Sequence, residues 1–149
     1  AEIHAAIADL RRYQPVIGIV AGTVGCFGGM SIAAGLCSYL IVTREARLGL
    51  NGPQVIEQEA GIEEYDSRDR PFIWSITGGE QRFASKLVDA YLEDDVGAMR
   101  ASVHEFIRMG APARHRSDRE ADFLACMERV DAAEQARPET VRAIYQKGL

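Results

Sequence analysis

A run without charged residues, from position 13 to position 43, contains the residues of this chain whose types and spacing could do chemistry. Its centre reads VGCFGGMSIAAG (24–35). A strand that ends in a glycine turn and leads into a helix leaves backbone N–H groups without intrahelical partners. Such a turn could bind a phosphate, stabilise an oxyanion that develops on a thioester carbonyl, or only let the helix pack closely on a sheet.

The phosphate interpretation fits this turn poorly. Gly22, Gly25 and Gly28 recur at intervals of three, and no Lys–Ser/Thr pair follows them, so neither common phosphate-binding motif is present. Cys26 lies beside the turn, but no histidine lies near it in sequence, which disfavours a thiol nucleophile. On the residues alone, the oxyanion and packing interpretations both remain open.

The segments around the turn predict a βαβ unit that would position it. Residues 15–22 are nearly all apolar and rich in β-branched side chains, which predicts a strand covered on both faces. Residues 30–38 predict a buried helix, and residues 39–43 (YLIVT) predict a second strand. Residues 48–50 predict a third extended piece, and Asn51-Gly52-Pro53 predicts a turn. We expect a right-handed crossover between the two strands.

The other segments predict mainly helices. A possible edge strand lies within residues 87–92, after a break at Gly78-Gly79. Asp94 and Asp95 predict an N-terminal cap, and Gly110 ends the helix that follows. Ser117 and Pro138 each predict the start of a further helix. The predicted helical segments are 1–13, 53–60, the start of 63–71, 72–77, 96–109, 117–135 and 138–149.

The composition limits the classes of function. At 149 residues, with 47% hydrophobic and 26% charged residues, the chain has the size and composition of one globular domain. A net charge of −5 argues against nucleic acid as a partner. Three cysteines without a CxxC pair predict no disulfide framework and no metal site, and they favour the cytoplasm.

The charge-free run is long enough to cross a membrane, but its residues argue against that role. It contains six glycines and Pro15, and each glycine weakens a helix by about 1 kcal/mol. A strand followed by a helix fits the run better than one continuous helix. The sequence therefore predicts no membrane association, and the amphipathic start AEIHAAIADLRR does not resemble a signal peptide.

Several stretches together resemble one enzyme superfamily. Residues 15–53 resemble the crotonase-superfamily segment in which a strand, a glycine turn and a buried helix form half of an oxyanion hole. Residues 27–58 are similar to the carboxyltransferase branch, with its aromatic-Gly-Gly turn and its VIEQ motif. The continuation GIEEYDSRDRPFIWSITGG (61–79) is similar to the β subunit of biotin-independent malonate decarboxylases. The resemblance covers about residues 10–95.

The resemblance implies an α/β, crotonase-like (ββα-spiral) carboxyltransferase fold, with 1–149 as a single domain and 94–149 as a mainly helical extension. Crotonase-type domains place the other oxyanion N–H and much of the carrier contact upstream of this segment. We therefore expect the chain to be the C-terminal portion of a longer domain, incomplete at its N-terminus.

The resemblance also implies roles for particular residues. The N–H groups of Gly28 and Gly29 would stabilise an oxyanion, and five further residues would border the substrate: Gly25, Phe27, Met30, Gly52 and Pro53. Packing alone would equally explain Phe27 and Met30 as core residues and 52–53 as a tight turn.

Two positions differ from the hydratase pattern, and they limit the reactions that the chain could catalyse. Where crotonase-family hydratases carry catalytic acids, this chain has Ser31 and Gln54, and neither side chain is a carboxylate base. Decarboxylation of a malonyl thioester needs no such base, because loss of CO₂ leaves an enolate that two N–H groups can stabilise. Removing one donor from an oxyanion hole typically costs about 3–4 kcal/mol.

The resemblance thus implies the β subunit of a malonate decarboxylase. Its substrate would be a malonyl thioester on the prosthetic thiol of an acyl carrier protein. It would act with a homologous γ subunit and bind no cofactor itself. One alternative is a β-type carboxyltransferase subunit of acetyl-CoA carboxylase or of another acyl-CoA carboxylase, which would require biotin. A second is a non-catalytic crotonase-fold subunit.

Other residues that could be functional have simpler explanations. His4, His104 and His115 fall on helical or loop segments and are expected at the surface. Trp74 is expected in the core or at an interface. Glu57 lies in the VIEQ motif but is not assigned to catalysis, because a glutamate in the first turns of a helix is favourable in any case.

Overall fold

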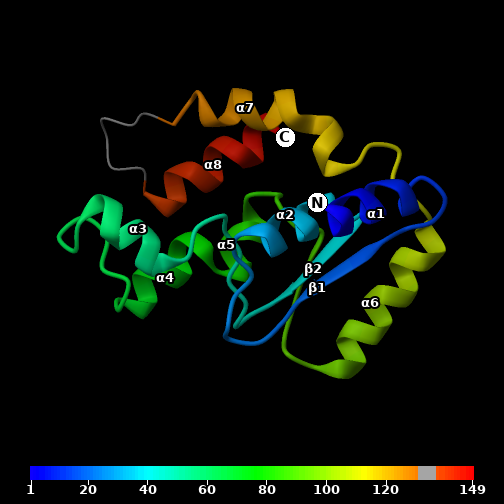
Figure 1. Ribbon diagram of the computed structural model, residues 1–149, viewed down its shortest axis with the longest axis horizontal. Coiled ribbons are helices and arrows are strands. Elements are labelled where there is room, and N and C mark those ends of the chain that lie inside the picture. Colours follow the sequence, from blue (N-terminus) through cyan, green and yellow to red (C-terminus); the bar gives the residue numbers. More distant parts are fainter. Residues whose placement is uncertain (131–136) are drawn as a thin grey trace.

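A three-stranded parallel sheet lies at the centre of the computed structural model, which describes residues 1–130 and 137–149 (Figure 1). The strands β1 (Ile17–Val20), β2 (Tyr39–Thr43) and β3 (Ala90–Leu92) follow one another across the sheet. β2 is buried along its whole length, because it has a strand on each side and side chains packed on both faces. The two predicted strands around the glycine turn are confirmed, and so is the edge strand within 87–92.

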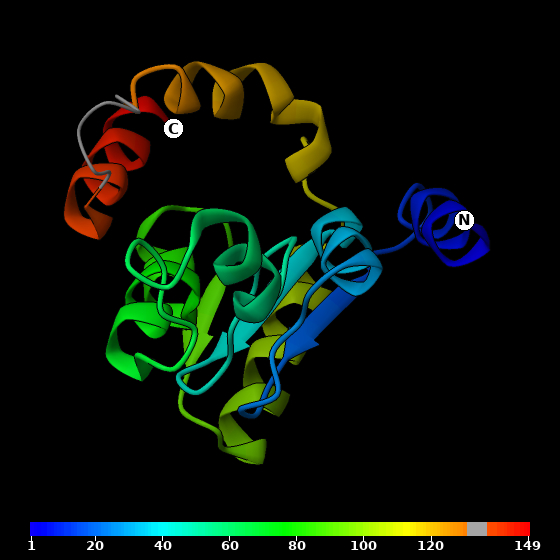
Figure 2. The same ribbon diagram turned by 60° about the vertical axis from the view of Figure 1, so that its left-hand side comes forward.

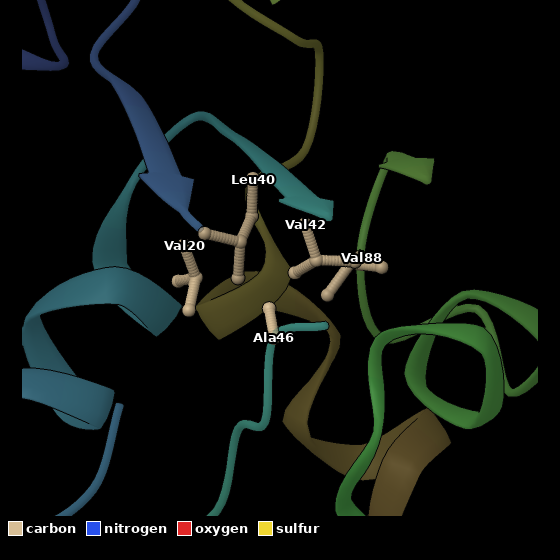
Figure 3. Close-up of a cluster of buried hydrophobic side chains, with 5 residues drawn as sticks. All are labelled: Val20, Leu40, Val42, Ala46 and Val88. Carbon is tan, nitrogen blue, oxygen red and sulfur yellow. The ribbon is translucent and has the colours of Figure 1, made fainter. Parts of the chain in front are cut away.

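The two faces of β2 carry different clusters, because successive side chains of a strand point to opposite sides. One cluster joins Leu40 and Val42 to Val20, Ala46 and Val88, as Figure 3 shows. The other consists of Tyr39, Ile41 and Phe106, and through Phe106 it packs helix α6 (Val96–Met109) against the sheet. The rings of Tyr39 and Phe106 stack with their centroids 4.3 Å apart.

Helix α2 (Gly29–Leu36) connects β1 to β2 and completes the predicted βαβ unit. The helix contains no charged residue, and three carbonyls at its C-terminal end and cap accept hydrogen bonds from arginines elsewhere in the chain. Arg11 donates to the Leu36 carbonyl, and Arg116 donates to the carbonyls of Gly35 and Cys37. Cations at a helix C-terminus offset its partial negative charge.

The expectation that this helix is buried is only partly correct. Ala33 is its single buried residue, while Met30 is 62% exposed and Ile32 is 50% exposed. The apolar composition of the helix predicted burial, but within the described residues no element covers this side of the helix.

Helices α3 (Pro53–Ala60), α4 (Arg70–Thr77) and α5 (Gly79–Ala84) follow β2. α3 begins at Pro53 and ends before Gly61, as predicted. The helix predicted at the start of 63–71 is wrong, because this part of the chain forms turns. The Asp69 carboxylate then caps α4 by accepting from the Phe72 N–H. The segment 48–50 is extended, but it does not join the central sheet.

The terminal helices lie outside this core. α1 (Glu2–Leu10) lies beside α2, and α7 (Glu120–Met127) with α8 (Pro138–Gly148) forms an arm that returns to α5 (Figure 2). Asp95 caps α6 as predicted. Ser117 is not a cap, because a short 3₁₀ helix, η1 (Arg116–Arg119), already begins after His115. Residues 131–135 of the predicted 117–135 helix lie outside the described residues.

Within residues 1–130 and 137–149, no helix combines the length and the apolar character needed to cross a membrane.

Candidate functional site

The glycine turn is held by hydrogen bonds to the extended segment 48–50 and its neighbour Arg47. The Cys26 N–H donates to the Arg47 carbonyl (2.8 Å), and the Gly49 N–H donates to the Cys26 carbonyl (3.2 Å). The Gly28 N–H donates to the Leu50 carbonyl (2.7 Å). This is the pattern of a short parallel ladder, so the predicted third extended piece pairs with the turn and not with the sheet.

The hydrogen bonds of this ladder determine which backbone N–H groups at the start of α2 have no acceptor within the protein. Because the Gly28 N–H already donates to Leu50, it is not available to a ligand in this arrangement. The next two N–H groups, of Gly29 and Met30, donate to no acceptor within the described residues. Of the two N–H groups implied as oxyanion donors, those of Gly28 and Gly29, only the Gly29 N–H is therefore free, and the Met30 N–H is a second free donor.

Gly28 nevertheless shapes the turn. It adopts φ +63°, a conformation that glycine reaches without strain, and it caps the start of α2. Its carbonyl accepts from the Ser31 hydroxyl (2.7 Å) and from the Ser31 N–H (3.0 Å). Where hydratases place a catalytic acid, Ser31 thus stabilises the first turn of the helix.

The Phe27 ring fills the space inside the turn. A Cβ on Gly25 would lie 2.5 Å from one edge of this ring, and a Cβ on Gly49 would lie 3.3 Å from the other edge. The Arg47 guanidinium lies 5.7 Å from the ring centroid. Gly25 (φ +88°) and Gly49 thus leave the room that the ring occupies.

Arg47 connects the turn to α4. One guanidinium nitrogen of Arg47 donates to the carbonyls of Thr23 (2.8 Å) and Val24 (3.0 Å). The guanidinium also lies 4.5 Å from the centroid of Trp74, whose indole N–H donates to the Glu45 carbonyl. Arg70 lies over the same ring at 5.2 Å, so the half-buried Trp74 supports two arginines. Cation–π contacts contribute about 0.5–2 kcal/mol each.

A cleft of about 310 Å³ opens beside the turn and α3. It brings together three of the predicted substrate-bordering residues, Phe27, Gly52 and Pro53. Gly25, Gly28, Gly29 and Met30 do not line it, although they belong to the adjoining turn. The remaining lining residues are Val24, Arg47, Gln54, Val55 and Ser67.

Two ionisable groups near the turn and α3, Cys26 and Glu57, have shifted pKa values. Burial raises the pKa of the Cys26 thiol, which disfavours the thiolate that a nucleophile would need. The Glu57 carboxylate accepts the Ser67 N–H (2.7 Å), and hydrogen bonding to Ser67 lowers the pKa of Glu57. Glu57 therefore fixes the chain after α3. In the described part of the chain, no cluster of three His, Cys, Asp or Glu side chains could hold a metal ion.

We compared the chain with known proteins. No family model matches it. It is similar to a chain of a Pseudomonas malonate decarboxylase hetero-tetramer solved in complex with malonate, with 67% sequence identity and a TM-score of 0.93 over 97% of this chain. Over nearly its whole length, the chain thus resembles a subunit of a malonate decarboxylase.

Further relatives show the same kind of similarity. A chain of a Pseudomonas malonate decarboxylase hetero-dimer is 63% identical over 85% of this chain, with a TM-score of 0.75. The malonyl-S-ACP:biotin-protein carboxyltransferase MADC of Malonomonas rubra is 41% identical over 83 residues. Transcarboxylase 12S is 28% identical with a TM-score of 0.57, which confirms the predicted carboxyltransferase-type α/β fold.

The chain spans only part of these relatives. It covers 52% and 51% of the two decarboxylase chains, 26% of the Malonomonas rubra protein and 19% of the transcarboxylase chain.

Two of the three histidines make contacts that their sequence neighbours do not indicate. His4 Nε2 lies 2.9 Å from the Gly29 carbonyl oxygen, so α1 contacts the first turn of α2. His115 is only 15% exposed in its side chain and lies between the Ser38 hydroxyl and the Asp118 carboxylate. The expectation of a surface position is therefore wrong for His115, whereas it is confirmed for His104. No local pattern marks the contact of His4, because its partner lies 25 residues away.

Proposed function

We propose that the full-length protein decarboxylates a malonyl thioester, carried by an acyl carrier protein, to the acetyl thioester and CO₂, as the β subunit of a malonate decarboxylase. The observation that carries this proposal is the 67% identity, over 97% of this chain, to a chain of a decarboxylase solved with malonate. The glycine turn with two free N–H groups supports it, because an enolate oxyanion is the charge that this chemistry must stabilise.

In the proposed reaction, the bond between the carboxylate carbon and Cα breaks, and its electron pair moves into an enolate on the thioester oxygen. The N–H groups of Gly29 and Met30 donate to that oxygen, and the positive end of the α2 dipole adds to their effect. CO₂ leaves, and a proton from water then adds to Cα to give the acetyl thioester. No carboxylate base is needed, in keeping with Ser31 and Gln54 at the positions where hydratases carry acids.

The cleft beside the turn supports a binding role for Phe27, Gly52 and Pro53. In the proposal, these residues border the acyl group and the nearby part of its carrier. A second, homologous subunit would contribute the opposite half of the site. The two Pseudomonas relatives form a hetero-tetramer and a hetero-dimer, which supports such an assembly.

A second candidate is transfer of the carboxyl group to a biotin-bearing protein. The 41% identity to the malonyl-S-ACP:biotin-protein carboxyltransferase favours it. The two candidates differ in their need for biotin. Acetyl thioester formation that persists after avidin has captured all biotinylated protein supports direct decarboxylation, whereas its loss supports the transferase.

A matched pair of substitutions at Gly29 tests the oxyanion role. Gly29→Pro removes the N–H at the first helical position, where proline is well tolerated. Gly29→Ala keeps the N–H, and its Cβ would meet no atom within 4 Å. In the assembled enzyme with malonyl–acyl carrier protein, we expect Gly29→Pro to lower kcat by about 10²–10³-fold and Gly29→Ala to retain near wild-type turnover. Equal kcat in the two variants would refute the role of this N–H group.

A further inference from the structure

Two equivalent contacts hold α1 against α2. His4 Nε2 lies 2.9 Å from the Gly29 carbonyl oxygen, at the start of α2. Arg11 donates from its guanidinium to the Leu36 carbonyl, also at 2.9 Å, at the end of α2. In each pair the partners are 25 residues apart, so the two helices run in the same direction and in register. His4 therefore lies at the end of α2 that carries the free N–H groups.

The contact of His4 is made with one particular peptide group. The carbonyl of Gly29 and the N–H of Met30 belong to the same amide, and this N–H is one of the two free donors of the turn. Since a carbonyl only accepts, His4 Nε2 must carry the hydrogen in this contact. A hydrogen bond accepted at the carbonyl polarises the amide and strengthens its N–H as a donor. It also fixes the orientation of that amide.

We propose that His4 is a positioning residue of the oxyanion turn, acting through the Gly29 carbonyl on the Met30 N–H. This inference rests on the proposed function, because it assigns to α1 a part in stabilising the same enolate. His4 acts on the amide group and not on the substrate. Its effect is therefore expected in the rate of the chemical step and not in substrate affinity.

The size of the effect follows from two magnitudes. One oxyanion donor contributes about 10²–10³-fold to the rate, and a neighbouring hydrogen bond strengthens another by about 10–30%. Loss of the His4 contact is therefore expected to lower kcat by about two- to eight-fold.

The experiment uses the full-length protein assembled with its partner subunit and malonyl–acyl carrier protein as the substrate. We expect His4→Leu to lower kcat by about two- to eight-fold with KM unchanged. We expect His4→Gln to keep most of the activity, because its amide nitrogen lies where His4 Nε2 does. Asparagine is too short to make this contact, so His4→Asn should lower kcat as His4→Leu does. His4→Asn replaces His4→Leu in the experiment if the leucine variant fails to assemble.

Arg11→Met is the matched control, because it removes the other hydrogen bond between the α1 segment and α2, at the end away from the turn, together with the bond from Arg11 to the Ser117 hydroxyl. We expect Arg11→Met to lower the unfolding temperature but to keep kcat. A wild-type kcat in both His4→Leu and His4→Asn would overturn the inference. An equal loss of kcat in the Arg11 and His4 variants would also overturn it, since α1 would then act only as packing. If the wild-type assembly forms no acetyl thioester, the proposed function itself fails.

Discussion

Replacing Gly25 by alanine should destabilise the glycine turn for two separable reasons. The first is conformational: Gly25 has φ +88°, and a left-handed conformation costs a residue with a side chain about 1–2 kcal/mol. The second is steric: the new Cβ would lie 2.5 Å from the Phe27 ring. The ring cannot retreat freely, because Gly49 and Arg47 lie against it. Such overpacking typically costs about 1–3 kcal/mol, which gives about 2–5 kcal/mol in total.

Substitutions at two other glycines of the charge-free segment allow the conformational cost and the steric cost to be measured separately. Gly22 has φ +76° but no atom within 4 Å of its would-be Cβ, so Gly22→Ala should cost only the conformational part, about 1–2 kcal/mol. Gly35 lies in α2 with open space around it, so Gly35→Ala should stabilise by about 0.5–1 kcal/mol. Denaturant unfolding of the full-length protein measures all three changes.

A double-mutant cycle tests the steric term directly. Adding Phe27→Leu to Gly25→Ala removes the ring that the methyl group meets, so we expect a favourable coupling of about 1–3 kcal/mol. A coupling near zero, or equal costs for Gly25→Ala and Gly22→Ala, would refute the reasoning that the Phe27 ring occupies the space beside Gly25.

Three further predictions concern side chains that contact α3, the C-terminal end of α2 and the glycine turn. Hydrogen bonding to Ser67 lowers the pKa of Glu57 below its ordinary value of 4.5. The ionised Glu57 therefore stabilises the folded protein at neutral pH, and this stabilisation is lost as the pH falls through the lowered pKa. In a plot of unfolding temperature against pH, Glu57→Gln should reduce the fall on the acid side. Arg116→Met, which removes three bonds including that to Asp89, should cost about 2–4 kcal/mol in urea unfolding; a cost below about 0.5 kcal/mol would contradict it. Cys26→Ala should keep kcat within about two-fold, and a complete loss would restore the nucleophile interpretation.

The parts of the fold that were predicted correctly are those whose signal is local. The apolar, β-branched residues 39–43 could be recognised as a strand because a buried central strand needs such side chains on both faces. Asp95 was recognised as a cap because the capping bond spans only three residues. Pro53 and Gly61 bounded α3 for the same local reason.

The parts that were missed depend on partners distant in sequence. Residues 48–50 are extended, as predicted, but nothing in their pattern indicates that they pair with the glycine turn. The free N–H groups shift by one residue, from the Gly28–Gly29 pair to Gly29 and Met30, only because Leu50 occupies the first of them. The helix expected at the start of 63–71 does not form, since a run of charged residues has no apolar face to bury.

The ladder between the glycine turn and segment 47–50 closes a long loop of the chain. The loop between Cys26 and Gly49 includes all of α2 and β2, so the shape of the turn depends on the placement of both elements. Opening the ladder would also release the Gly28 N–H, and the turn would then offer three donors in place of two. Amide hydrogen exchange at Gly28 reports this opening directly, because its protection measures how often the donor set rearranges in the folded protein.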